Sequence, residues 1–240
     1  YPKFKDKIKY IVIDKEPDGI VEENNNPTLQ RANSLKRIEL SYDEHFNAIR
    51  DANDDDFIML SDNDEIPNLD SEDFKKNKND IVIFNQLFFY FKFNLLYDRM
   101  LWPGTKGCRK KNLKSFSWLR NIKFKKYPIW RIDTYFSNTK YSNLNIIKDG
   151  GWHFTNLKSP EDMFEKFMNF GHHDEFKLSG ITVDKIRDKI SKREMFYDHF
   201  ADKSSKNKWD SDYKLKKIDT DLLPRYLVSN REKYLKWFDI

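Results

Sequence analysis

The chain has 240 residues, enough for one sizeable α/β domain spanning 1–240, and its 16% aromatic content favours a folded, aromatic-rich core over disorder. Its seven glycines form no Gly-rich phosphate loop, and its single cysteine excludes an internal disulfide framework. No apolar run is long enough to span a membrane, so the sequence predicts a soluble protein without a membrane span.

Alternating strands and helices predict an α/β fold with a mostly parallel sheet flanked by helices. Buried strands are expected at 8–14, 57–60 and 81–84, and the aromatic run 87–93 continues as strand or core. Helix starts are expected at Asn26-Pro27, at the Ser41-x-x-Glu44 capping box, at Ser159-Pro160 and at Thr182. The part 182–240 is expected to be a helical extension, with a last helix over 221–238 that Pro224 interrupts.

The strongest chemical signal is the acidic end of the strand at 57–60. Asp62 and Asp64 follow four apolar residues, and Pro67 limits any continuation of the strand. If the backbone stays extended, both carboxylates project to the same side. Two such oxygen donors suit Mn²⁺ or Mg²⁺, which complete their shells with water and substrate phosphates. The alternative is a strand-end turn capped by aspartates.

The charge distribution supports an anionic substrate bridged by a cation. The segment 43–73 is rich in acids, whereas 99–132 contains no acid. The basic residues of that second segment are Arg99, Lys106, Arg109, Lys110, Lys111, Lys114, Arg120, Lys123, Lys125, Lys126 and Arg131. We expect Arg31, Lys106 and Arg109 to contact substrate phosphates, with a solvated basic surface as the alternative for most of the basic residues.

Other residues have side chains that could contact a ligand. Trp102, beside Pro103-Gly104, and Trp152 offer apolar faces for a sugar ring, and His153 can bind metal or phosphate. Buried structural roles are the alternative for Trp152 and His153. In the cluster 172–175, Glu175 or Asp174 is the expected catalytic base, or else part of a polar helix end.

Several motifs occur in the order found in a known family. Asp62-Asn63-Asp64-Glu65-Ile66-Pro67 resembles an Asp-x-Asp-Glu-Ile-Pro signature, and Gln30-Arg31-x-Asn33 resembles a helix upstream of it. Three later stretches resemble further motifs of that family: 89–94 followed by Trp102, then Gly151-Trp152-His153-Phe154-Thr155, and then Lys166 with 172–175. Together they resemble glycosyltransferase family 17, the family of the bisecting N-acetylglucosaminyltransferases. Gly171, where that family has a hydroxyl residue, and the doubled histidine at 172–173 depart from the pattern.

The resemblance implies a GT-A-type, Rossmann-like fold whose first strand would precede Tyr1. It also implies an inverting transfer of a sugar, such as GlcNAc, from a nucleotide-diphosphate donor, with a UDP-sugar and Mn²⁺ expected. The acceptor would be a glycan or another hydroxyl group. Glu65 could then be a third metal ligand, an acceptor contact or a support for the strand end.

Two other functions compete with this interpretation. A metal-dependent nuclease or phosphoesterase would also use carboxylates and nearby lysines. A non-catalytic nucleic-acid binder would use the basic and aromatic segment 99–131, but it gives the strand-end carboxylates no role, so nucleic acid is not the expected partner. The Lys-, Asn- and Ile-rich composition suggests a microbial or viral genome. A single cysteine suits the cytoplasm, or a secretory lumen if an amino-terminal anchor precedes the chain.

Overall fold

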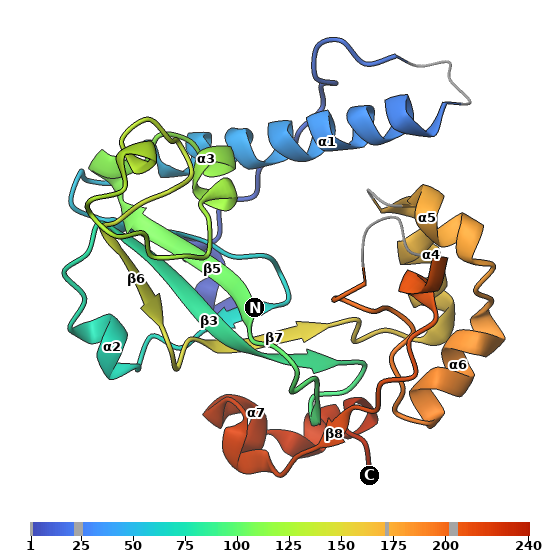
Figure 1. Cartoon of the computed structure of the whole chain (residues 1–240). Helices are drawn as coiled ribbons and strands as arrows, with labels where there is room; N and C mark the ends of the chain where they lie inside the picture. The colour runs from blue at the N-terminus through green and yellow to red at the C-terminus, as the bar shows by residue number, and fades with distance from the viewer. Residues whose placement is uncertain (1, 22–25, 171–172, 202–205) are drawn as a thin grey trace. The chain divides into compact units, whose positions relative to one another are not determined.

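The computed structural model describes residues 2–21, 26–170, 173–201 and 206–240 (Figure 1). The strands are β1 Phe57–Leu60, β2 Glu65–Pro67, β3 Ile81–Tyr90, β4 Leu95–Leu96, β5 Trp102–Arg109, β6 Leu144–Ile147, β7 Gly151–Thr155 and β8 Lys216–Lys217. The α-helices are α1 Pro27–Glu44, α2 Glu72–Lys75, α3 Phe116–Asn121, α4 Pro160–Asn169, α5 His173–Ser179, α6 Val183–Ser191 and α7 Arg225–Ser229. The 3₁₀ segments are η1 Pro2–Lys7, η2 His45–Ile49, η3 Lys110–Asn112, η4 Ile132–Thr134, η5 Lys206–Trp209, η6 Thr220–Leu222 and η7 Arg231–Trp237.

The chain folds as two compact units. The first comprises Tyr1–Leu60, Lys78–Val82 and Lys106–Asn145, and the second comprises Ser61–Asn77, Ile83–Thr105 and Ile146–Ile240. The acidic motif therefore belongs to the second unit. None of the helices in the described ranges is long and apolar enough to cross a membrane.

The fold is mixed α/β, but the expectation of a mostly parallel sheet is wrong, because most of the strand pairs are antiparallel. The strand order is β1-β5-β3-β4-β8, with β6 and β7 also paired to β3 and β2 paired to β7. Pairing is antiparallel for β1–β5, β2–β7, β3–β4 and β4–β8, and it is parallel for β3–β7. Short connections such as the one between β3 and β4 permit only antiparallel neighbours, because a parallel pair needs a long crossover.

The first unit contains the long helix α1, whose start is confirmed by its cap. The Asn26 side chain accepts the Thr28 backbone N–H, and a proline follows the cap. The expected second helix start at Ser41 is wrong, because α1 continues to Glu44 and the Ser41 hydroxyl donates to the Ile38 carbonyl at 2.7 Å.

Two strand predictions in the first unit also needed correction. The stretch 8–14 has no regular structure and is largely exposed, because no strand pairs with it. β1 is a strand, but only Ile58 is buried and Met59 is exposed. It pairs with β5 alone as an edge strand, which accounts for its incomplete burial.

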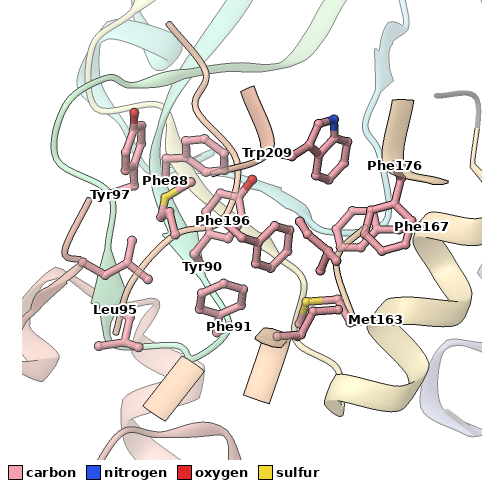
Figure 2. Close-up of a cluster of buried hydrophobic side chains, with 14 residues drawn as sticks. Phe88, Tyr90, Phe91, Leu95, Tyr97, Met163, Phe167, Phe176, Phe196 and Trp209 are labelled. Atoms are coloured by element: carbon pink, nitrogen blue, oxygen red, sulfur yellow. The ribbon is translucent and has the colours of Figure 1, made fainter. Parts of the chain in front are cut away.

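The second unit has an aromatic core that confirms the structural interpretation for 88–91. Phe88, Tyr90 and Phe91 of the β3 region pack with side chains from three α-helices and from the chain that follows α6, such as Phe196 and Trp209 (Figure 2). The helical members are Met163 and Phe167 of α4, Phe176 of α5 and Ile186 of α6.

The helices of the second unit follow local signals closely at their starts. Ser159 caps α4 and Thr182 caps α6, each accepting a backbone N–H three residues later. The helix that begins at Thr182 was expected to run towards His199, but α6 ends at Ser191. The expected helix over 221–238 is a short α7 after Pro224 followed by η7. The part 182–240 is thus only partly helical.

Candidate functional site

The acidic motif forms a tight turn in place of an extended strand end. The Glu65 backbone N–H donates to the Asp62 carbonyl at 3.0 Å, which closes a four-residue turn with Asn63 and Asp64 at its centre. Asn and Asp favour such positions because their short side chains bond to nearby backbone. The expectation that strand geometry aligns Asp62 and Asp64 is therefore wrong. The backbone forms a turn at the end of the strand, as in the alternative interpretation.

β2 leaves this turn and pairs with β7, which fixes the motif against Trp152 and His153. Glu65 lies opposite His153 and Ile66 lies opposite Trp152. The Phe154 backbone N–H donates to the Asp64 carbonyl at 2.8 Å, so the turn is also tied to β7. These contacts explain why two motifs about ninety residues apart in the chain form one site.

Glu65 is the buried support of the turn. Its side chain is 1% exposed, and Trp102 Nε1 donates to Oε1 at 2.9 Å. The Asp62 backbone N–H and the Thr105 hydroxyl donate to Oε2 at 3.3 and 3.5 Å. Of the three roles considered for Glu65, these contacts match the one that holds the acidic segment in place.

His153 and Trp102 form a stacked pair beside the carboxylates. Their ring centroids are 4.6 Å apart with an interplanar angle of 23°, and Phe88 packs on both rings. His153 Nδ1 lies 3.8 Å from Asp64 Oδ1 and 4.0 Å from Glu65 Oε1. The structure thus brings together four of the predicted site residues, Asp64, Glu65, Trp102 and His153.

A pocket of about 460 Å³ opens beside Asp64. Small-molecule sites have volumes of this order and combine apolar walls with a few polar groups. The apolar lining residues are Ile66, Phe93, Phe154 and Leu157, and the polar ones are Asn63, Asp64, Asn156, Lys158 and Lys166.

Lys166 is one of the two lysines that line the pocket. Its ammonium donates to Asn156 Oδ1 at 2.9 Å. Burial lowers the pKa of Lys166 below its ordinary 10.5, and the negative charge of Asp64 opposes that shift. Asn156 is buried and has a φ of 57°, a left-handed conformation that Asn tolerates better than most residues.

The other predicted donor-binding residues have different surroundings. Arg31 lies in α1 of the first unit, and Lys106 and Arg109 lie in the part of β5 that belongs to the same unit. The Lys106 ammonium donates to the carbonyls of Arg120 and Ile122 at the end of α3, and Arg109 donates to the Asp55 carbonyl. These contacts are structural, so the phosphate contacts of all three residues stay predictions.

Trp152 and Glu175 also have structural contacts. Trp152 Nε1 donates to the Leu222 carbonyl at 2.5 Å, and its ring packs against a buried cluster that includes Phe89 and Phe154. Glu175 Oε2 accepts from Lys208 at 2.5 Å. The side chain of Asp174 lies outside the described part of the chain, as does His172.

The sequence does not predict Asn156 and Lys158 as site residues. Phe93 and Lys166 are indicated only by the family resemblance. No local pattern identifies these residues, because the pocket is formed by β2, the segment after β7 and α4. The one available signal is the position of Asn156 and Lys158 directly after β7.

Among the residues that the structure describes, no three His, Cys, Asp or Glu side chains converge as a metal-binding group. No protein-family model, curated protein or solved structure matches this chain.

Proposed function

We propose that the chain is a metal-dependent glycosyltransferase that uses a nucleotide-diphosphate sugar and a glycan or other hydroxyl acceptor. The observation that carries the proposal is the pocket beside Asp64, which is lined by a carboxylate, two ammonium groups, two amides and several apolar side chains. A sugar phosphate has matching chemistry, because its hydroxyl and phosphate groups need polar partners and its ring has an apolar face.

The donor set of the turn fits Mn²⁺ or Mg²⁺. Asp62 and Asp64 supply two hard oxygen donors, and the Asp64 side chain is 26% exposed and lines the pocket. These ions commonly use one or two protein carboxylates and leave the remaining positions to water and phosphate. When bound, the cation would neutralise charge on the leaving diphosphate.

The chain's own residues would divide the remaining work. Lys166 would contact a phosphate oxygen, because it lines the pocket and interacts electrostatically with Asp64. Phe93 and Phe154 would pack against the sugar or the base. Glu65, Trp102 and His153 would hold the turn in position without contacting the substrate. Asp174 and Glu175 remain the predicted proton acceptors of an inverting reaction.

The test is a screen of nucleotide sugars, UDP-sugars first, for Mn²⁺-dependent turnover. We expect one donor to be consumed, and Asp64→Asn and Asp62→Asn to lower kcat/KM by at least about 100-fold, as removal of key electrostatic groups does. Asp73→Asn is the matched control, because Asp73 is an exposed carboxylate in α2 of the same unit.

The competing nuclease or phosphoesterase function is tested with the same proteins. Cleavage of a phosphodiester that requires Asp64, without turnover of any sugar nucleotide, would replace the proposal with that function. Turnover that survives both substitutions would remove the acidic turn from the mechanism.

A further inference from the structure

The segment 123–141 of the first unit is a closed loop that follows α3 (Figure 1). Its two ends are joined by backbone hydrogen bonds, from Lys123 N–H to the Thr139 carbonyl at 2.8 Å and from Tyr127 N–H to the Tyr141 carbonyl at 3.2 Å. Tyr127 is buried at this base. The middle of the loop contains η4 and turns back on itself.

Large apolar side chains are concentrated in the middle of this loop and exposed. The exposed fractions are 71% for Ile129, 82% for Trp130, 73% for Ile132, 71% for Tyr135 and 87% for Phe136. Isolated exposed apolar residues are common, but five such residues within eight positions form a patch that indicates an interaction site. We call these five residues the apolar tip.

The apolar tip is held by contacts within the loop. Asp133 accepts from Arg131 Nε at 2.7 Å and from Lys140 Nζ at 2.8 Å, and the Tyr135 hydroxyl donates to the Ile129 carbonyl at 3.3 Å. Asp133 is the only acid in 123–141, and its two basic neighbours lower its pKa to about 2, so it stays ionised and paired. A surface that is ordered before it binds loses less conformational entropy on binding.

The residues that precede the tip are basic. Lys123, Lys125 and Lys126 are exposed and have no acid near them in sequence. The loop therefore combines insertable apolar side chains with a surrounding positive charge. Peripheral membrane-binding segments have this combination, in which Trp and Phe enter the headgroup boundary while lysines contact anionic lipids.

The composition of the tip distinguishes between possible occupants. A single-stranded nucleic acid would need ring faces for stacking, and the two isoleucines offer none. A lipid boundary accepts both aliphatic and aromatic side chains, and Trp and Tyr are enriched at membrane interfaces.

We infer that the loop 123–141 binds an anionic membrane surface by inserting the apolar tip while its lysines contact lipid headgroups. This binding is independent of the pocket beside Asp64 and of the proposed transferase activity. It would hold the protein at a lipid surface without a membrane-spanning segment in the described chain.

The test is flotation of the full chain with vesicles of phosphatidylcholine and phosphatidylserine at about 3:1, compared with phosphatidylcholine alone. We expect binding to the anionic vesicles that weakens as salt shortens the screening length. Trp130→Ser/Phe136→Ser should weaken binding at least about tenfold, because two large apolar side chains no longer leave water. Lys125→Glu/Lys126→Glu should weaken it by a similar factor on anionic vesicles.

The matched control is Leu178→Ser/Tyr226→Ser, which removes exposed apolar side chains outside the loop, and it should bind like the wild type. Far-UV circular dichroism and thermal midpoints should match in all variants, because every substituted side chain is exposed. The proposal fails if the wild type does not float, or if the Trp130/Phe136 variant floats equally well. It also fails if the same variant loses binding to a single-stranded oligonucleotide while vesicles do not bind.

Discussion

His199 lies in the aromatic cluster of the second unit with its Nε2 3.0 Å from the Tyr90 hydroxyl. Burial lowers the pKa of His199 from 6.5 to about 4, so the imidazole is neutral in the folded protein near neutral pH. As pH falls below 6.5, the unfolded chain binds the proton first, and the free energy of unfolding falls until pH passes about 4. The stability lost in this window is at most about 3 kcal/mol.

Urea unfolding across that pH window measures the effect. His199→Gln retains a polar side chain but does not titrate, so its unfolding free energy should fall less steeply with decreasing pH than that of the wild type. Identical slopes for the two proteins would show that His199 does not couple folding to protons.

Lys166 should show opposing effects on stability and binding. Folding disfavours its charged form, since burial lowers the pKa below 10.5, so the ammonium destabilises the folded state at neutral pH. Lys166→Met should leave the thermal midpoint unchanged or higher, while affinity for the nucleotide sugar falls at least about tenfold.

The control is Lys166→Arg, which keeps the positive charge and should keep more of the affinity than the Met variant. Calorimetric titration with the donor found in the screen, and thermal unfolding, separate the two effects. An unchanged affinity in Lys166→Met would show that the pocket lysine does not contact the ligand.

At the scale of elements, the β2–β7 pair decides whether the acidic turn and His153 form one site. Gly151 lies opposite Pro67 with a φ of +106°, and a Cβ there would lie 2.2 Å from the Ile66 carbonyl oxygen. Gly151→Ala should therefore lower the free energy of unfolding by about 3 kcal/mol or more, because β2 and β7 must separate and the backbone is strained.

Gly180→Ala is the matched control. Gly180 also has a positive φ, +66°, but a Cβ there meets no atom within 4 Å, so the cost should be only about 1 kcal/mol. Chemical denaturation of both variants gives the comparison. Equal losses would mean that the close approach of β2 to β7 does not constrain residue 151.

The predictions of elements succeeded where the controlling contacts are local. The caps of α1, α4 and α6 involve residues two or three positions apart, and each was identifiable from the sequence. The capping box at Ser41 failed because the helix had already begun at Pro27, and a continuing helix supplies the hydrogen bonds that a cap would otherwise provide.

At the scale of the whole molecule, the proposed transferase should bind the metal and the nucleotide cooperatively. Two carboxylates alone hold a divalent cation weakly, and the diphosphate would complete its coordination. Mn²⁺ or the nucleotide alone should therefore raise the thermal midpoint little, and the two together should raise it more than the sum of the separate shifts.

Thermal unfolding with each ligand separately and together, with and without EDTA, checks this prediction. Asp64→Asn should abolish the cooperative part while Asp73→Asn should keep it. A full shift from the nucleotide in the presence of EDTA would show that donor binding does not require the metal.

The sequence by itself determined the mixed α/β class, the aromatic core at 88–91 and the helix starts at Pro27 and Pro160. These features depend on residue type and short-range periodicity, both of which can be seen in the sequence. Only the tertiary structure decided the antiparallel pairing, the supporting role of Glu65 and the pocket formed with Asn156 and Lys166. Those features require residues from about forty to about ninety positions apart in the chain to meet, and this depends on how the strands of the second unit pair and pack.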